Sequence, residues 1–260
     1  MTIAVEPDWW KTLFDEIYLV TDARTVRDDA RTRREIDLFS RLVPVEAEHR
    51  VLDLCGGHGR HTLELKRRGC GPCIVLDYSR VLLAEGHQTA AGENLPVACI
   101  QGDARAAPLA SGAFDIVLIL GNSLGYLADE DADLHILQES RRLLAPGGRL
   151  LVDVMNGAAV RQNLAPNAWH EIGPDVVVCR QREIRGNRVC ARELVISKTR
   201  GTIRDETYGI RLYEPRQLSD LVNRAGFADI RITTDRSDLH SREDRGCMNH
   251  RLVVDARKPA

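Results

Sequence analysis

The chain has 260 residues, of which 43% are hydrophobic and 28% charged, and its formal net charge is −2. These values are ordinary for a globular protein, and no apolar run reaches the ~18 residues that a membrane-spanning helix needs. A net charge near zero also gives no electrostatic footprint for nucleic acid, so we expect neither a membrane protein nor a nucleic-acid-binding one.

The N-terminal sequence and the cysteines bear on the cellular compartment. MTIAVEPDWWKT lacks the basic segment followed by an apolar segment that marks a secretory signal. Seven cysteines, an odd number in a chain of this length, are expected to be reduced thiols and not a disulfide framework. Both features predict a cytoplasmic protein.

The first forty residues have the hydrophobic spacing of helices. In WWKTLFDEIYL, Trp10, Phe14 and Ile17 fall on one helical face, and TRREIDLFSRLV places Ile36 and Phe39 likewise. We therefore expect two helices at the N-terminus, each with one buried side.

From Arg50 the pattern changes to short apolar runs that alternate with helical segments. The runs are RVLDL, CIVLDY, VACIQGD, FDIVLILG and RLLVDVM. Strands that alternate with helices in this way indicate a parallel sheet.

The pattern changes again in the second half of the chain. DVVVCRQREI, RVCARELVIS and TYGIRLY alternate apolar with polar residues around RGN and RGT turns, which indicates an antiparallel β insertion. A helix, EPRQLSDLVNRAGF, then precedes ADIRITTD and HRLVVDARK, two strands that would complete a seven-stranded sheet. We expect cap helices over residues 1–45, the sheet domain over 46–160 and 214–260, and the insertion over 161–213.

The stretch VLDLCGGHGRHTLEL joins the first strand to a helix through a glycine-rich turn. The dinucleotide motif G-x-G-x-x-G fails here, because counting from Gly57 its third glycine would be Thr62. Asp53 would also direct a carboxylate toward a pyrophosphate. The phosphate-binding loop of nucleotide hydrolases fails as well, since no Gly-Lys-Ser/Thr follows.

A positively charged ligand suits the same turn, and S-adenosylmethionine offers a sulfonium and an ammonium group beside a ribose and an adenine. Asp77 ends the second strand 18 residues beyond Gly59, where an acid accepts hydrogen bonds from ribose hydroxyls. Asp103 ends the third strand, where it could meet the adenine amino group while the Ala104 amide meets a ring nitrogen. With Asp53, three acids stand at three successive strand ends.

These residues occur within a longer resemblance. The fragments VLDLCGGHGRHTLELKRRG, IVLDYS, IQGDARAAPLASGAFDIVLIL, NSLGYL, LLAPGGRLLVDVMN and LYEPRQLSDLVNRAGF occur in the order typical of one family. The chain thus resembles the class I S-adenosylmethionine-dependent methyltransferases, in particular the small-molecule group. This resemblance implies a Rossmann-like α/β fold with S-adenosylmethionine as cofactor.

The resemblance also implies a set of cofactor-binding residues. Asp53, Gly57 and Gly59 belong to the cofactor loop, and Asp77 to the ribose site. The remaining candidates are Tyr18, Cys55, Tyr78, Asp103, Ala104, Gly121 and Asn122, of which Gly121 and Asn122 form the floor below the methyl group. Cys55 departs from the family pattern, which has a glycine there, and its Cβ narrows the space for the methionine part of the cofactor.

Two cysteine motifs have competing interpretations. Cys55-x-x-His58-x-x-His61 has the residue types of a zinc site, but a structural site needs four ligands, so we expect ordinary polar contacts and no metal. CGPC, residues 70–73, spells a thioredoxin-type redox pair. It follows a helix and precedes a strand, where no helix N-terminus favours a thiolate, so a turn with two half-buried thiols is expected.

Several side chains could contact the cofactor or the acceptor, although none is singled out as the catalytic base. The aromatic set closes over the cofactor or only packs against the sheet; its members are Trp9, Trp10, Phe14 and Tyr18. The candidate bases are His170, Tyr126 and Tyr208. Five arginines are expected on a solvated helix face: Arg24, Arg27, Arg31, Arg33 and Arg34. The alternative is that one of the five binds a carboxylate or phosphate of the substrate.

The expected function is methyl transfer to oxygen or nitrogen of a small molecule, such as a natural-product intermediate, an amino sugar or an amine metabolite. We expect no nucleic-acid partner and no membrane partner. A homodimer is the one assembly considered, and the sequence does not decide between it and a monomer. One alternative is an RNA or protein methyltransferase on the same scaffold. The sequence GNSL argues against it, because base-flipping enzymes have Asn-Pro-Pro-aromatic at this position. The other alternative is a protein that binds the cofactor without methylating.

Overall fold

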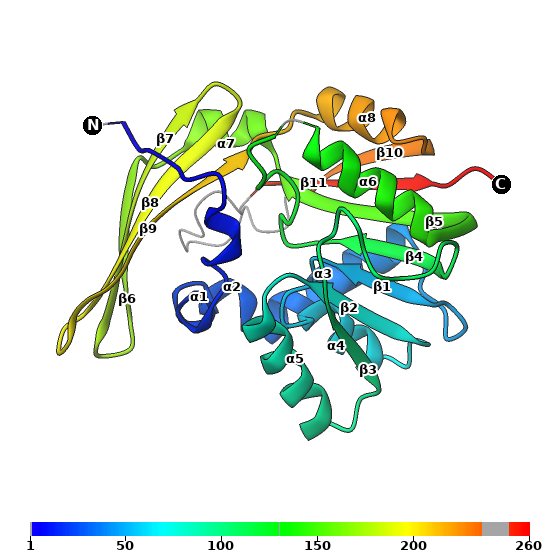
Figure 1. Ribbon diagram of the computed structural model, residues 1–260, viewed down its shortest axis with the longest axis horizontal. Helices are drawn as coiled ribbons and strands as arrows, with labels where there is room; N and C mark the ends of the chain where they lie inside the picture. The colour runs from blue at the N-terminus through cyan, green and yellow to red at the C-terminus, as the bar shows by residue number, and fades with distance from the viewer. Residues whose placement is uncertain (1, 130, 236–249) are drawn as a thin grey trace.

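A computed structural model describes residues 2–129, 131–235 and 250–260 of the chain. Within these ranges seven strands form one central sheet, on the right of Figure 1. In their order across the sheet they are β10 (Ala228–Asp235), β11 (Arg251–Arg257), β5 (Leu144–Met155), β4 (Phe114–Ile119), β1 (Val51–Leu54), β2 (Cys73–Asp77) and β3 (Val97–Gln101). The predicted seven-stranded Rossmann-like α/β sheet is confirmed.

The order of the strands reverses beside β1. This strand pairs in parallel with both β2 and β4, although the chain reaches β4 only after passing through β2 and β3. In open sheets of this kind, ligands bind outside the carboxyl ends of the strands at such a reversal. β11 runs antiparallel to both of its neighbours, β5 and β10.

Helices bury both faces of the central sheet, so neighbouring residues of a strand belong to different hydrophobic cores. The helices are α3 (Asp29–Leu42), α4 (Arg60–Arg67), α5 (Arg80–Gly92), α6 (Ala132–Leu143) and α8 (Pro215–Arg224). On β4, Leu118 packs in the core of α3 and α4, whereas Val117 packs in that of α6 and α8. None of the helices in the described part of the chain has the length and apolar character needed to pass through a bilayer.

A second, antiparallel sheet stands beside the first, on the left of Figure 1. Its strands, in spatial order, are β6 (Asn167–Ile172), β7 (Val176–Arg185), β8 (Arg188–Ser197) and β9 (Gly201–Arg211). The helix α7 (Gly157–Asn163) connects it to β5. This sheet is the antiparallel β insertion that the alternation of polar and apolar residues predicted.

The N-terminal segment connects the two sheets. It contains a 3-10 turn η1 (Trp9–Lys11) and the helices α1 (Glu16–Thr21) and α2 (Ala23–Val26), seen between the sheets in Figure 1. Asp15 forms an ion pair with Arg204 of β9, while the hydroxyl of Ser79, after β2, donates a hydrogen bond to the Phe14 carbonyl at 2.6 Å.

The prediction of one continuous helix over WWKTLFDEIYL is wrong. Asp15 has an extended backbone conformation and caps α1, with its carboxylate accepting hydrogen bonds from the Ile17 and Tyr18 amides at 2.9 and 3.1 Å. A side chain that satisfies the free amides of a helix start favours a new helix at that point. The segment is therefore broken in two, and the second half is turned toward the cavity described below.

Candidate functional site

The turn after β1 has a backbone that only small residues fit. Cys55, Gly57 and Gly59 all have positive φ, at 61°, 59° and 72°. A Cβ on Gly56 would lie 2.6 Å from Cγ of Asp53, and one on Gly59 would lie 2.9 Å from a methyl group of Val75. The glycines thus let the turn pass close to the strands before α4 begins at Arg60.

Asp53 is almost completely buried beneath this turn, with an exposure of 1%. One carboxylate oxygen accepts a hydrogen bond from the Thr62 hydroxyl at 2.8 Å, whereas the other has no partner among the described residues. Burial raises the pKa of Asp53 to about 6. A buried carboxylate with an unsatisfied oxygen is suited to a cationic or hydrogen-bond-donating ligand.

Asp77 ties the end of β2 to the glycine turn. Its two oxygens accept hydrogen bonds from the amides of Gly57 and Ser79, each at 2.8 Å. Both oxygens keep further lone pairs for hydroxyl groups of a ligand. Burial raises the pKa of Asp77.

Asp103 differs from the other two acids because its charge is already paired. Arg105 contacts both oxygens of its carboxylate, and this hydrogen-bonded neighbour lowers the pKa of Asp103. The Arg105 guanidinium in turn lies 5.7 Å from the centre of the Trp10 ring. Asp103 and Ala104 both line the cavity at the strand ends.

Gly121 and Asn122, directly after β4, connect this strand end to β5. Both have a φ of 68°. The Gly121 amide donates to the Asp153 carboxylate at 3.2 Å, and the Asn122 side-chain oxygen accepts from the Met155 amide at 2.8 Å. The Asn122 side chain therefore braces the backbone, which sets the shape of the floor between β1 and β4.

Two adjoining cavities lie over these strand ends. The strand-end cavity, about 120 Å³, is lined by residues at the end of β2 and in the loops after β2 and β3, including Asp77, Tyr78, Asp103 and Ala104. The inter-sheet cavity, about 190 Å³, extends to the second sheet. Eight residues line both cavities: Phe14, Tyr18, Cys55, Gly57, Leu82, Gly121, Ser123 and Tyr126. The glycine turn, the N-terminal segment and the loop after β4 thus meet where the cavities join.

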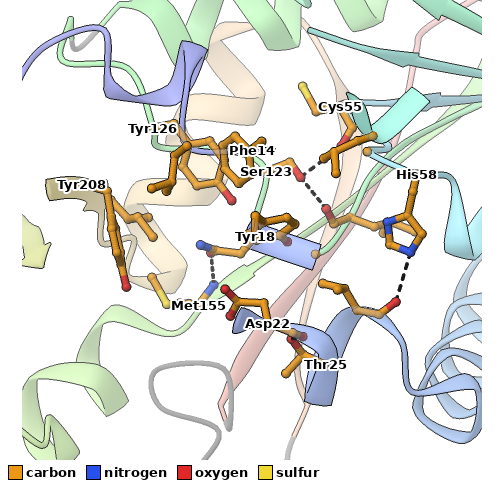
Figure 2. A pocket seen from close by; sticks show the side chains of 18 of the residues that line it. Phe14, Tyr18, Asp22, Thr25, Cys55, His58, Ser123, Tyr126, Met155 and Tyr208 are labelled. Atoms are coloured by element: carbon orange, nitrogen blue, oxygen red, sulfur yellow. Dashed lines mark hydrogen bonds between the residues drawn. The ribbon is translucent and has the colours of Figure 1, made fainter. Parts of the chain in front are cut away.

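Aromatic side chains from three parts of the chain form one wall of the inter-sheet cavity. The ring of Trp9 lies 5.2 Å from that of Tyr126 and 5.7 Å from that of Tyr208, and Phe14 lies 5.5 Å from Tyr126. Figure 2 shows Tyr126 and Tyr208 on the side of the cavity opposite Cys55 and His58. Near the strand-end cavity, Trp10 packs edge-on against Tyr78 at 4.8 Å. The predicted aromatic set therefore lines the cavities in addition to packing.

The candidate bases differ in where the structure places them. Tyr126 and Tyr208 line the inter-sheet cavity, whereas His170, on β6, is not among the residues that line either cavity. Burial raises the pKa of Tyr18, Tyr126 and Tyr208, so their hydroxyls stay protonated at neutral pH. They are suited to donating hydrogen bonds and poorly suited to removing a proton.

The two histidines of the glycine turn are held by protein groups. Nε2 of His58 donates to the Val26 carbonyl at 3.0 Å, and Nε2 of His61 contacts the Glu35 carboxylate at 2.9 Å. Burial lowers the pKa of each to about 4, so both are neutral at pH 7. Each imidazole thus has one nitrogen engaged in a polar contact within the protein.

The CGPC sequence covers the end of the turn between α4 and β2 and the first residue of β2, Cys73, and it lines neither cavity. The sulfur atoms of Cys70 and Cys73 are 3.7 Å apart, and the two residues are 6% and 3% exposed. Six of the seven cysteines lie in the described ranges, where all six are free thiols. The seventh, Cys247, lies outside the described residues.

The expectation of a solvated arginine face is wrong for Arg31. This side chain is 2% exposed, lines the inter-sheet cavity and contacts Glu35 at 2.8 Å. The expectation failed because helical periodicity identifies an apolar face but not an ion pair buried beside it. The side chain of Arg24 lies outside the described part of the structure.

Sequence reasoning found Tyr208 but missed the charged residues that the second sheet contributes. Arg180 and Arg182 on β7 and Glu193 on β8 line the inter-sheet cavity. The signal was present, because two charged residues at positions i and i+2 of a strand share one face. Without the placement of the sheet, however, nothing in the sequence tells which face is buried.

The region that holds the first strands and the glycine turn is similar to known proteins. A family model described as a methyltransferase domain matches residues 51–148. The chain is 38% identical to a demethylmenaquinone methyltransferase of Thermus thermophilus over 46% of this chain and 51% of that protein. It is 30% identical to a glycine/sarcosine N-methyltransferase of Parasynechococcus marenigrum over 66% of this chain and 64% of that protein. The chain thus spans about half to two thirds of these relatives.

Among solved structures, the fold is similar to that of the CcbJ methyltransferase from Streptomyces caelestis. The TM-score is 0.73, with 96% of this chain and 99% of that chain covered, at 22% sequence identity. The likeness therefore extends over the second sheet as well as the central one.

Proposed function

We propose that this chain is a class I S-adenosylmethionine-dependent methyltransferase, as the match of residues 51–148 to a methyltransferase-domain model supports, and that it transfers a methyl group from that cofactor to a small molecule in the inter-sheet cavity. The observation that carries the proposal is the junction of the two cavities at the glycine turn. A donor in one cavity and an acceptor in the other would be aligned there for direct displacement, and alignment is the main contribution a protein makes to such a reaction.

The strand-end cavity has the groups that the cofactor requires. Asp77 has lone pairs available for ribose hydroxyls, and Ala104 lies where an adenine ring would be bound. The unpartnered oxygen of Asp53, a residue that lines the adjoining inter-sheet cavity, lies beneath the turn, where it favours the positive charge of the methionine part. When bound, the cofactor supplies a methyl group on a sulfonium, which needs no further activation.

The inter-sheet cavity favours a compact acceptor. The second sheet and the N-terminal segment cover it, and an ion pair between Arg204 and Asp15 connects the sheet to the segment. We propose that residues 1–45 and 161–213 act together as the acceptor-binding part, and that 46–160 with 214–260 act as the cofactor-binding part. A polymer would need a more open approach, which supports a small molecule over RNA or protein.

A nitrogen acceptor is favoured over a hydroxyl. The phenols that line the cavity have raised pKa values, and the pKa of His58 is lowered to about 4, so none of these side chains readily removes a proton from a hydroxyl at neutral pH. A neutral amine needs no such base. The similarity to a glycine/sarcosine N-methyltransferase supports the same choice.

Transfer of a labelled methyl group tests the proposal. The purified protein is incubated with methyl-labelled S-adenosylmethionine and separate small-molecule, RNA and protein fractions of a cell extract. We expect label in the small-molecule fraction alone. Label in RNA or protein would favour the polymer alternatives, and binding of the cofactor without label in any fraction would favour a role other than methylation.

A further inference from the structure

One face of the second sheet forms the floor of the inter-sheet cavity and carries a buried arginine. Arg182 on β7 pairs with Ala191 on β8, which pairs with Tyr208 on β9, and all three line the cavity. Residues directly opposite one another on antiparallel strands point to the same face. The guanidinium and the phenol therefore stand on either side of the small Ala191 side chain, with room above it.

Arg182 differs in its partners from the other arginines around this cavity. Three other arginines with described side chains line it, and each contacts a glutamate, at 2.8, 2.5 and 2.7 Å: Arg31, Arg60 and Arg180. Among the described residues no carboxylate contacts Arg182. Within the described part of the chain, its one side-chain hydrogen bond is donated from Nη1 to the Ala165 carbonyl at 3.4 Å, although the residue is only 9% exposed.

A guanidinium buried in this way lacks the charge that usually accompanies it. It has five N–H donors in a planar fork, and leaving such a cation without a counter-charge is costly. The fork matches the geometry of a carboxylate or a phosphate, which binds through two parallel hydrogen bonds. Beside it, the Tyr208 hydroxyl has no hydrogen bond to another described residue and can donate one more.

We propose that the acceptor carries an anionic group, a carboxylate or a phosphate, which binds between Arg182 and the Tyr208 hydroxyl. The inference rests on the proposed function and names the class of acceptor that the same site takes. Anchored on the second sheet, the acceptor extends its reacting nitrogen toward Tyr126 and the glycine turn, where the two cavities join. Arg182 is thus a specificity-determining residue that contacts the substrate away from the reacting atoms.

The experiment uses the labelled small-molecule extract, separated by anion exchange at about pH 12, where amines are uncharged and only the anionic group keeps its charge, before and after treatment with a phosphatase. We expect the labelled product among the anions. Loss of its charge on phosphatase treatment assigns the anion as a phosphate, and no change assigns it as a carboxylate. Label only in neutral or cationic products would overturn the inference while leaving the proposed function intact, whereas no label in any fraction would mean that the proposed function itself has failed.

Variants of Arg182 test its role directly, with the anionic fraction of the extract as the acceptor. In Arg182→Met the half-saturating amount of that fraction should rise about 10- to 100-fold while the maximal rate changes little, since a charge-assisted bidentate contact is lost. Arg182→Lys should recover part of the loss. The control is Arg192→Met, an exposed arginine of β8 that pairs with Asp205 and does not line the cavity.

Calorimetry with S-adenosylhomocysteine separates loss of acceptor binding from misfolding. Arg182→Met and Arg182→Lys should bind this ligand as tightly as the wild type, because the strand-end cavity is unchanged. If both variants bind it normally and their half-saturating amounts equal that of Arg192→Met, Arg182 does not hold the acceptor. If Arg182→Met no longer binds S-adenosylhomocysteine, Arg182→Lys alone is compared with the wild type. A half-saturating amount for Arg182→Lys equal to that of the wild type then shows that Arg182 does not hold the acceptor.

Discussion

Cys55 adopts a backbone conformation that favours glycine, and its side chain forms part of the wall of both cavities. Its φ of 61° is in the left-handed region, where a residue other than glycine costs about 1 kcal/mol or more. We predict that Cys55→Gly binds S-adenosylhomocysteine severalfold more tightly, measured by calorimetry, because the Cβ and the sulfur no longer narrow the space beside the turn.

The matched control is Cys55→Ala, which keeps the Cβ and the positive φ but removes the sulfur. It should gain less affinity than Cys55→Gly. Equal or weaker binding by Cys55→Gly would show that the cysteine does not restrict the ligand.

His58 makes the stability of the fold depend on pH. Burial lowers its pKa from the ordinary 6.5 to about 4. Between these values His58 binds a proton in the unfolded chain but not in the folded chain. The contribution of His58 to the free energy of unfolding therefore falls as the pH decreases from 6.5 toward 4. When the pH is lowered from 7 to 5, the free energy of unfolding measured with urea should fall by about 2 kcal/mol more in the wild type than in His58→Gln.

Glutamine at position 58 keeps an N–H donor for the Val26 carbonyl but does not titrate. Every other titrating group is common to both proteins, so its contribution cancels in the difference. Parallel pH profiles for the two proteins would mean that the imidazole is not buried as described.

At the scale of elements, Asp15 decides how the N-terminal segment covers the cavity. Its carboxylate caps α1 through two amides and pairs with Arg204, a β9 side chain that is 4% exposed. Asp15→Ala should lower the free energy of unfolding by about 1–2 kcal/mol and speed hydrogen exchange of the α1 amides, since the cap and the ion pair are lost together.

Asp15→Asn separates the two contributions, because asparagine is also a good N-cap but carries no charge. Fast exchange of α1 in Asp15→Ala alone assigns the effect to the cap, and fast exchange in both variants assigns it to the pairing with Arg204. Exchange as slow as in the wild type in both would contradict this account of the segment.

Element patterns in the sequence predicted most of the central sheet. Its strands are short apolar runs whose neighbouring residues enter different cores, as Val117 and Leu118 do, so the apolar run itself identifies a strand buried on both faces. The broken helix before Glu16 was missed because its cause is partly distant. Arg204, which holds Asp15 in place, lies 189 residues further along the chain.

At the scale of the whole molecule, the acids at the strand ends could be predicted because topology brings the carboxyl ends of parallel strands together. The second sheet could be predicted as a sheet, but not its position over the site. The inter-sheet cavity depends on that position, and so do the roles of Arg182 and Tyr208. Tyr208 was a candidate from its residue type alone, whereas nothing in the alternating pattern of β7 distinguished Arg182. His170, a candidate on the neighbouring strand, falls outside the cavity for the same reason.

The proposed function depends on a site at the strand ends for an adenosyl ligand whose methionine part carries a positively charged ammonium group. Calorimetric titration of the purified chain with S-adenosylhomocysteine, alongside Asp77→Ala and Cys70→Ser, tests it most directly. We expect saturable binding that Asp77→Ala weakens severely, since the ribose loses its acceptor, and that Cys70→Ser leaves nearly unchanged, since Cys70 lines neither cavity. Failure to bind this ligand, together with binding of NAD, would contradict it.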